Sequence, residues 1–173
     1  MNYTLLSKKT FQLSNKEINK ICRLKDTNWK FGIESQLRWF KNSVRKKDIH
    51  NLLQYNKNII GYTLLRERKC FISKIPKKYY LFDTLIINKQ FRKKHLSNYL
   101  MNFNNEIILK GSKTAFLICK NEMIRFYKRF KWIKLNKKNF IIKDHNSNLN
   151  GMIFNFKSLK PVGKFNFQFW FLK

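Results

Sequence analysis

Glycine, proline and cysteine are all scarce in this chain. Only 2 prolines and 5 glycines occur among the 173 residues, so no segment has the composition of a flexible linker and nothing marks a domain boundary. The 3 cysteines, Cys22, Cys70 and Cys119, lie far apart and show neither the CxxC spacing of a metal site nor a disulfide framework. We therefore expect one domain in a reducing compartment, the cytoplasm.

Long hydrophobic runs and clusters of metal ligands are also missing. No apolar run approaches the roughly 18 residues that a transmembrane helix needs, and the first residues lack the charged-then-apolar pattern of a signal peptide. Histidine, cysteine and acidic residues nowhere gather at metal-ligand spacing. We expect no membrane span and no metal.

Acidic residues are few, and the basic excess is large. The chain has 9 Asp and Glu against 38 Lys and Arg, which gives a formal charge of +29. Such a field attracts nucleic acid, anionic membranes or acidic small molecules. However, 30 of the basic residues are Lys, and Lys, Asn, Ile and Phe together account for 86 residues. All four have codons made only of A and T, so an AT-rich genome explains the charge without polyanion binding. Arginine, which is favoured for phosphate and base contacts, is not enriched.

Hydrophobic periodicity predicts alternating strands and helices. Ser14, with Glu17 three residues later, forms a capping-box pattern before a helix, and a second helix is expected over residues 32–47. A third helix is expected from about Lys93 to Lys110, where Gly111 ends it. The expected strands are Tyr3–Ser7, Asp48–Tyr55, Asn58–Arg68, Tyr79–Asn88, Lys113–Lys120 and short closing antiparallel strands after about residue 132.

The predicted order of elements is β-α-α-β-β-β-α-β-α-β-β. It favours a single-domain α/β (α+β) fold with a mixed, mostly antiparallel sheet of about six or seven strands and helices on both faces. We assign residues 1–160 to the domain. The aromatic tail 161–173 is expected to pack on the domain or on a partner in a homodimer; the alternatives are that it covers a sheet edge or lies at a membrane surface.

Three segments carry motifs: LIINKQFRKKHLSNYLM, NEMIRFYKRFKW and NIIGYTLLR. Together, and in their order along the chain, they resemble the GCN5-related N-acetyltransferase superfamily, over roughly Leu6 to Phe156. In the first segment Arg92 matches the start of the family's Arg/Gln-x-x-Gly-x-Gly/Ala signature, and His95 and Ser97 take the two glycine positions. The second segment has Lys131 where glycine is usual and matches the family pattern at Asn121, Ile124, Phe126, Tyr127 and Trp132.

The resemblance implies that the turn binds the pyrophosphate of acetyl-CoA, the co-substrate. Backbone N–H groups at a helix start have no helical partner, and the helix dipole adds positive charge there. The side chain of His95 costs about 1 kcal/mol if its position needs a positive φ. The implied cofactor-binding residues are Leu85, Ile86, Ile87, Arg92, Lys93, Lys94, His95, Leu96, Ser97, Asn121 and Tyr127.

Catalytic roles are implied in the same way. Tyr127 matches the tyrosine that protonates the departing thiolate of coenzyme A, and Asn121 would either bind the cofactor arm or cap a helix. The strands Tyr79–Asn88 and Lys113–Lys120 are expected to splay and leave a cleft for the pantetheine arm. Amide groups near Leu85 would stabilise the oxyanion.

The general base is not fixed by a motif. Asp83 is our first candidate, because we place it on the strand face of Leu85 and Ile87; an ion pair is its alternative role. Glu34 and His145 are the other candidates on the substrate side. We interpret His50 as structural.

The predicted function is acetyl transfer from acetyl-CoA to a primary amine of a small molecule by direct attack. The segments WKFGIESQLRWF and DIHNLLQY resemble relatives that act on amino sugars of bacterial surface polysaccharides, so such a sugar is one candidate acceptor. The alternatives are a protein acetyltransferase and a non-catalytic nucleic-acid-binding module, with lysines on phosphates and exposed aromatics on bases.

Overall fold

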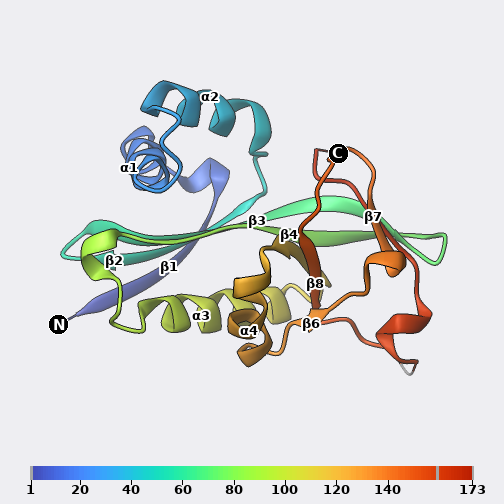
Figure 1. Ribbon diagram of the computed structural model, residues 1–173. Coiled ribbons are helices and arrows are strands. Elements are labelled where there is room, and N and C mark those ends of the chain that lie inside the picture. The colour runs from blue at the N-terminus through green and yellow to red at the C-terminus, as the bar shows by residue number, and fades with distance from the viewer. Residues whose placement is uncertain (1, 159, 173) are drawn as a thin grey trace. The chain divides into compact units, whose positions relative to one another are not determined.

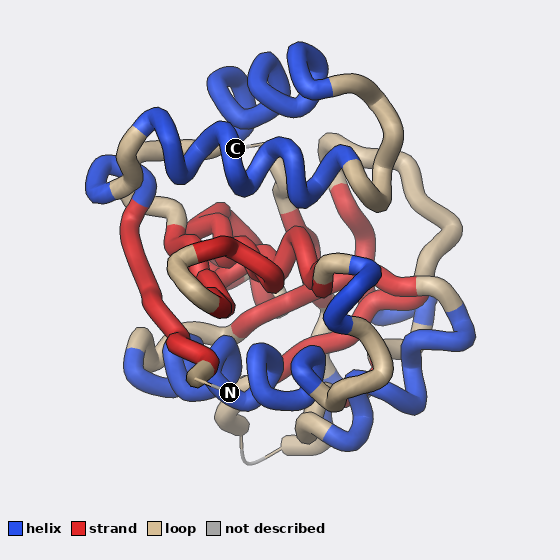
Figure 2. The backbone as a smooth tube through the Cα atoms, turned by 90° about the vertical axis from the view of Figure 1, so that its left-hand side faces the viewer, coloured by secondary structure: helices blue, strands red, loops and turns tan. Residues whose placement is uncertain are grey.

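The computed structural model describes residues 2–158 and 160–172. The chain divides into two compact units. The first unit contains residues 2–66 and 83–104, and the second contains residues 67–82 and the described residues from 105 onward. Figure 2 distinguishes the helices, strands and loops along the backbone. The predicted α/β class and the predicted order of the first nine elements are confirmed.

The first unit is built on antiparallel strands. β1 (Tyr3–Lys9) pairs with β2 (Ile49–Tyr55), and β2 pairs with β3 (Asn58–Ile72). Asn56 and Lys57 join β2 to β3 with φ angles of 47° and 61°. Two consecutive left-handed residues are typical of a tight hairpin turn.

Helices cover both faces of these strands (Figure 1). α1 (Asn15–Asp26) begins with the predicted capping box, in which the Ser14 hydroxyl accepts a hydrogen bond from the Glu17 amide. α1 and α2 (Ile33–Ser43) pack on one face, with Ile21 and Leu24 against the sheet. The beginning of α3 (Leu96–Lys110) packs on the other face.

β3 and β4 (Ile75–Ile87) are both longer than the predicted strands, and both run through the two units. The turn between them consists of Ser73 and Lys74, with φ angles of 47° and 71°. The prediction ended the first strand at Arg68, although the apolar residues Cys70, Phe71 and Ile72 continue it.

In the second unit, β4 pairs in parallel with β5 (Ala115–Cys119). β5 pairs antiparallel with β8 (Asn150–Phe154), which pairs antiparallel with β6 (Ile133–Lys134). α4 (Asn121–Arg129) follows β5 directly. The central order is β1-β2-β3-β4-β5-β8-β6.

The closing strands differ from the prediction in one respect. β7 (Phe140–Ile142) does not pair antiparallel with its neighbours in sequence; it pairs in parallel with β9 (Phe167–Phe169), a strand that the sequence analysis did not assign. β9 also pairs antiparallel with β3, at residues 70–72. The partner of β7 thus comes from the distant tail, which local periodicity does not reveal.

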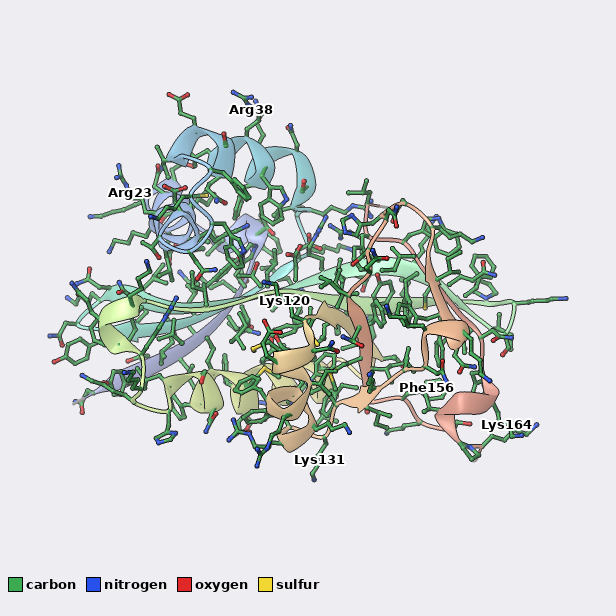
Figure 3. All side chains as sticks on the ribbon, viewed as in Figure 1. Arg23, Arg38, Lys120, Lys131, Phe156 and Lys164 are labelled. Atoms are coloured by element: carbon green, nitrogen blue, oxygen red, sulfur yellow. The ribbon has the colours of Figure 1, made fainter. Side chains whose placement is uncertain are left out.

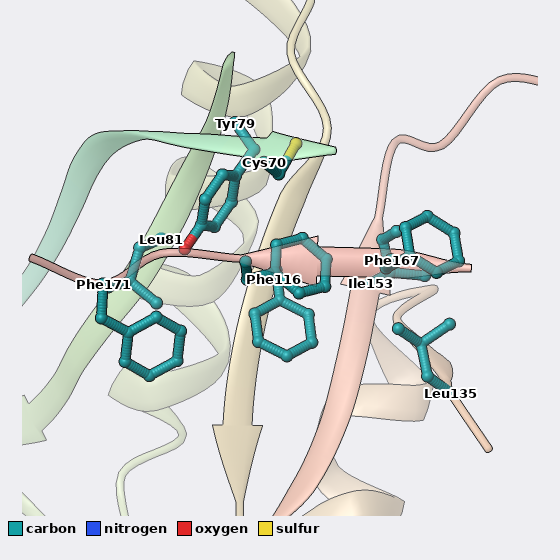
Figure 4. Packing of buried hydrophobic residues seen from close by; sticks show 9 residues of the cluster. Cys70, Tyr79, Leu81, Phe116, Leu135, Ile153, Phe167 and Phe171 are labelled. Carbon is teal, nitrogen blue, oxygen red and sulfur yellow. The ribbon is translucent and has the colours of Figure 1, made fainter. Parts of the chain in front are cut away.

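The core of the second unit is aromatic (Figure 4). The rings of Phe116 and Phe169 stack with centroids 3.8 Å apart, and Tyr79 meets Phe169 edge-on at 4.9 Å. Gly151 on β8 leaves room for this stack, because a Cβ atom there would lie 2.8 Å from the Phe116 ring. Such close contact is not tolerated in a packed core.

Candidate functional site

The turn that joins β4 to α3 has an unusual backbone. Lys93 and His95 both adopt left-handed conformations, with φ angles of 62° and 55°. α3 therefore begins at Leu96 rather than at Lys93 as the sequence predicted. Left-handed residues interspersed in a turn bring successive N–H groups into a concave nest that binds anions.

The amides of this turn are unpaired. Within the described residues, the N–H groups of Lys93, Lys94, His95, Leu96 and Ser97 donate to no backbone or side-chain oxygen. The first N–H engaged by the helix is that of Asn98, which donates to the His95 carbonyl at 2.9 Å. The turn thus presents consecutive free donors at the positive end of a helix.

His95 occupies one of the positions where the resemblance placed glycine, and it keeps the glycine-like backbone. Histidine is among the residues enriched in the left-handed region, so the strain is about 1 kcal/mol rather than prohibitive. The side chain of His95 is exposed. Lys131, which stands where glycine is usual in the second motif, also has a positive φ, of 64°.

Arg92 folds back onto the protein. Its Nε donates to the carbonyl of Ile87 at 3.1 Å, and a terminal guanidinium nitrogen donates to the Asn28 side-chain oxygen at 3.1 Å. Arg92 therefore holds the turn against the end of β4. The side chains of Lys93 and Lys94 are exposed.

The end of β4 does not follow simple alternation. Leu85 and Ile87 pack in the cluster with Leu96 of α3, whereas Ile86 packs with α1. Asp83 was predicted to share the face of Leu85 and Ile87, and this is wrong. Its contacts lie on the α1 and α2 side, so the alternation shifts by one residue between Asp83 and Leu85.

Asp83 is held by an ion pair within the first unit. One of its carboxylate oxygens lies 2.7 Å from an Arg66 nitrogen, and the Asp83 side chain is 25% exposed. Arg66 also donates to the carbonyl of Ser43 at 2.9 Å. The Nε of Arg66 is buried and has no partner among the described residues.

Next to this pair lies a lysine that the sequence analysis did not single out. The Lys25 ammonium sits 3.2 Å from the centroid of the Trp39 ring, and the Arg66 guanidinium lies 5.7 Å from the same ring. Burial lowers the pKa of Lys25 to about 8, and the charge of Asp83 opposes that shift. The sequence held a signal, because Lys25 continues the helical stripe of Ile18, Ile21 and Cys22.

Glu34 and His145, the other two candidates on the substrate side, belong to different units. Glu34 lies exposed in the first turn of α2, in the first unit. His145 is in the second unit, where its ring stacks on Phe171 with centroids 5.5 Å apart. Neither side chain shares a hydrogen bond or ion pair with Asp83.

Tyr127 lies on α4 in the second unit. Its ring meets Phe82 edge-on at 6.1 Å and lies 6.1 Å from Trp132, and the residue is 7% exposed. Its hydroxyl makes no hydrogen bond with a described residue. Burial raises the pKa of the phenol, and Cys119 raises it further. The hydroxyl therefore stays protonated at neutral pH and is available as a proton donor.

Asn121 is the first residue of α4, and Lys120 occupies the N-cap position without a side-chain capping hydrogen bond. The side-chain oxygen of Asn121 accepts a hydrogen bond from Asn150 at 2.9 Å. Asn121 therefore does not cap the helix, and its side-chain oxygen already has a hydrogen-bond partner in Asn150.

The parallel pairing of β4 with β5 is short. It joins Tyr80 to Ala115 and Leu81 to Phe116, and within the described residues the register extends no further. β4 continues to Ile87 and β5 to Cys119. Beyond these two residue pairs, the backbone N–H and C=O groups of the described β4 and β5 residues do not pair with one another.

The basic side chains are spread over the chain. Among those labelled in Figure 3, Arg23 and Arg38 extend from α1 and α2, and Lys131 and Lys164 extend from the second unit. Within the described residues, no three His, Cys, Asp or Glu side chains form a group that could hold a metal ion. The helices that the structure describes include none long and apolar enough to cross a membrane.

Neither a protein-family model nor a curated protein sequence matches this chain. Solved structures do. An acyl-CoA N-acyltransferase from Pseudomonas aeruginosa has a TM-score of 0.67 and 11% identity, covering 88% of this chain and 99% of its own. Escherichia coli ElaA has a TM-score of 0.65 and 14% identity, with the same coverage.

A third similar structure contains the ligand that the turn suggests. It is the GNAT family N-acetyltransferase YhbS from Escherichia coli in complex with CoA, with a TM-score of 0.62 and 9% identity, covering 88% of this chain and 82% of that one. The arrangement of strands and helices is common to all three. The chain has the fold of the GCN5-related N-acetyltransferases.

Proposed function

We propose that this protein is an acetyl-CoA-dependent N-acetyltransferase that acts on a primary amine. The observation that carries the proposal is the turn between β4 and α3, with its free amides from Lys93 to Ser97 and its two left-handed residues. Such a nest suits a pyrophosphate. The fold it shares with a CoA-bound acetyltransferase supports the same ligand.

In this proposal the backbone N–H groups of the turn donate hydrogen bonds to the pyrophosphate oxygens. The hydroxyl of Ser97 and the ammonium groups of Lys93 and Lys94 add further donors and charge. The pantetheine arm binds the backbone groups of Leu85, Ile86 and Ile87. The side-chain NH2 group of Asn121 donates a further hydrogen bond to the arm. A backbone N–H near Leu85 stabilises the oxyanion as the amine attacks.

Tyr127 supplies the proton that completes the reaction. The amine nitrogen forms a bond to the thioester carbonyl carbon, and the carbon–sulfur bond breaks as the tetrahedral intermediate collapses. The departing thiolate takes the phenolic proton of Tyr127. The raised pKa of Tyr127 keeps the phenol protonated before the carbon–sulfur bond breaks.

Asp83 acts on the amine. Its ion pair with Arg66 leaves one carboxylate oxygen for an ammonium group, so we assign it to orienting the acceptor and to taking up the amine proton directly or through water. Glu34 and His145 are secondary candidates for contact with the acceptor. An amino sugar of a surface polysaccharide is one acceptor that would present such an amine.

The binding test is thermal unfolding with acetyl-CoA. A ligand that binds only the native state raises stability by about 2.7 kcal/mol at a hundredfold excess over its Kd, so we expect a rise in Tm of about 5 °C or more. Pantetheine, which lacks the pyrophosphate, should give a much smaller rise.

The variant His95→Glu places a negative charge beside the nest and should lower the affinity for acetyl-CoA about tenfold, whereas the neutral His95→Gln should not. An unchanged Tm at millimolar acetyl-CoA would refute the proposal.

The catalytic test is Tyr127→Phe, which removes the hydroxyl and keeps the ring. Acetyl transfer to a panel of amines should slow by about 100-fold or more, while the acetyl-CoA-dependent rise in Tm is retained. Equal rates for the wild type and Tyr127→Phe would remove Tyr127 from the mechanism without affecting the cofactor assignment.

A further inference from the structure

A groove lies where the hairpin of β3 and β4 meets the residues after β9. All of its lining residues belong to the second unit, and its volume is about 530 Å³. The groove combines an aromatic floor with a basic rim. Its lining includes the aromatic residues Phe71 and Trp170, together with Pro76 and the basic residues Lys69, Lys77 and Lys78.

Both backbone groups of Trp170 form hydrogen bonds that fix its position. Its N–H donates to the Lys69 carbonyl at 3.1 Å, and its carbonyl accepts from the Tyr79 hydroxyl at 2.8 Å. The indole is half-exposed and lies 5.4 Å from the Phe71 ring at an interplanar angle of 56°. A ring fixed in this way loses little conformational freedom when another flat ring stacks on it.

The rim has more positive than negative charge. Lys78 lies 3.4 Å from the Glu67 carboxylate, which also receives Lys113 at 3.3 Å, so one acid serves two lysines. Lys69 and Lys77 are exposed and have no acidic partner among the described residues. The positive rim favours an anionic ligand, and the aromatic floor favours a ligand that also contains a flat aromatic ring.

We propose that this groove binds single-stranded nucleic acid. A base stacks on Trp170, and the adjacent phosphates contact Lys69, Lys77 and Lys78. This pairing of an aromatic platform with cations that follow the backbone is how single strands are bound without sequence preference. A formal charge of +29 adds long-range attraction. The inference is independent of acetyl transfer.

The test measures the anisotropy of a labelled oligothymidine and of an RNA of the same length, over a range of salt concentrations. Trp170→Ala should weaken binding by roughly 5- to 150-fold, the usual loss for one stacked base. The double variant Lys69→Gln/Lys77→Gln should reduce the slope of log K against log salt by about 1.4, because each phosphate contact on a single strand contributes about 0.7.

Matched variants separate the groove from the general charge. Trp29→Ala removes an exposed tryptophan from the first unit, and Lys16→Gln/Lys47→Gln removes the same charge from exposed positions there. Both should bind as the wild type does, and so should His95→Glu, which affects the turn. Circular dichroism and cooperative thermal unfolding confirm that each variant is folded.

Three outcomes would overturn the proposal. Equal losses in the groove variants and the matched variants would show that binding reflects charge alone. A loss in His95→Glu only would place the oligonucleotide at the turn. Absence of oligonucleotide binding, with Trp170-dependent binding to vesicles of anionic lipid, would assign the groove to a membrane surface instead.

Discussion

His95 adopts a backbone conformation that a residue without a Cβ atom would adopt more easily. His95→Gly removes the left-handed strain at φ 55°, so we expect it to raise the free energy of unfolding by about 0.5–1 kcal/mol. Because the native imidazole is exposed, affinity for acetyl-CoA should change little. Urea unfolding and isothermal titration measure the two effects.

His95→Ala is the control for this substitution, because it removes the imidazole and keeps the Cβ atom. It should not gain stability. A large gain in acetyl-CoA affinity in both variants would mean that the imidazole obstructs the phosphate, and a gain in His95→Gly alone would point to the Cβ atom.

His50 is a buried histidine that stays neutral. It is 0% exposed, and its two ring nitrogens lie 2.9 Å from the Thr10 hydroxyl and 2.8 Å from the Tyr62 hydroxyl. Burial, together with the charge of Lys25, lowers the pKa of His50 from 6.5 to about 3. The unfolded state therefore binds a proton between these pH values that the folded state does not.

Stability should fall as the pH falls through this window. The pKa of His50 is lower in the folded state than in the unfolded state. His50 therefore leaves the free energy of unfolding unchanged above pH 6.5 and lowers it by about 1.4 kcal/mol per pH unit between pH 6.5 and about pH 3. Urea unfolding of the wild type and His50→Gln from pH 7 to pH 4 measures this. The variant should be less stable at pH 7 and lose less stability on acidification; parallel curves would contradict the assignment.

At the scale of elements, β9 completes the core of the second unit. Phe169 is 0% exposed, and its ring stacks on Phe116 at 3.8 Å. Phe169→Ala should lower the free energy of unfolding by about 3–5 kcal/mol, because it leaves a cavity among aromatic rings. Urea denaturation measures the loss.

Leu172→Ala is the matched control from the same segment, because Leu172 is 61% exposed. It should change stability by less than about 0.5 kcal/mol. If Phe169→Ala were equally mild, β9 would contribute little to the native core.

For the whole molecule, the charge of +29 opposes folding. Like charges repel more strongly in the compact state, and salt screens them. Raising NaCl from about 10 to about 100 mM shortens the Debye length from ~30 to ~10 Å, so Tm should rise by a few degrees. An equal osmolality of sucrose controls for non-ionic effects, and a Tm that falls with NaCl would show that attractive ion pairs outweigh the repulsion.

Local patterns in the sequence determined most of the elements. The Ser14–Glu17 capping box sets the start of α1 at the predicted residue, because both partners lie within one helical turn. Alternation and turn residues located β2 and the beginning of β3 for the same reason. The motif order also pointed to the fold of the GCN5-related N-acetyltransferases.

Only the tertiary structure decided which distant groups meet. The pairing of β7 with β9, the shift of face between Asp83 and Leu85, and the contact of Lys25 with Trp39 depend on how separate elements pack against one another. Their energies come from packing and burial, which have no local period. The sequence could locate His95 at a glycine position, but its left-handed φ follows from how β4 and α3 constrain the turn between them.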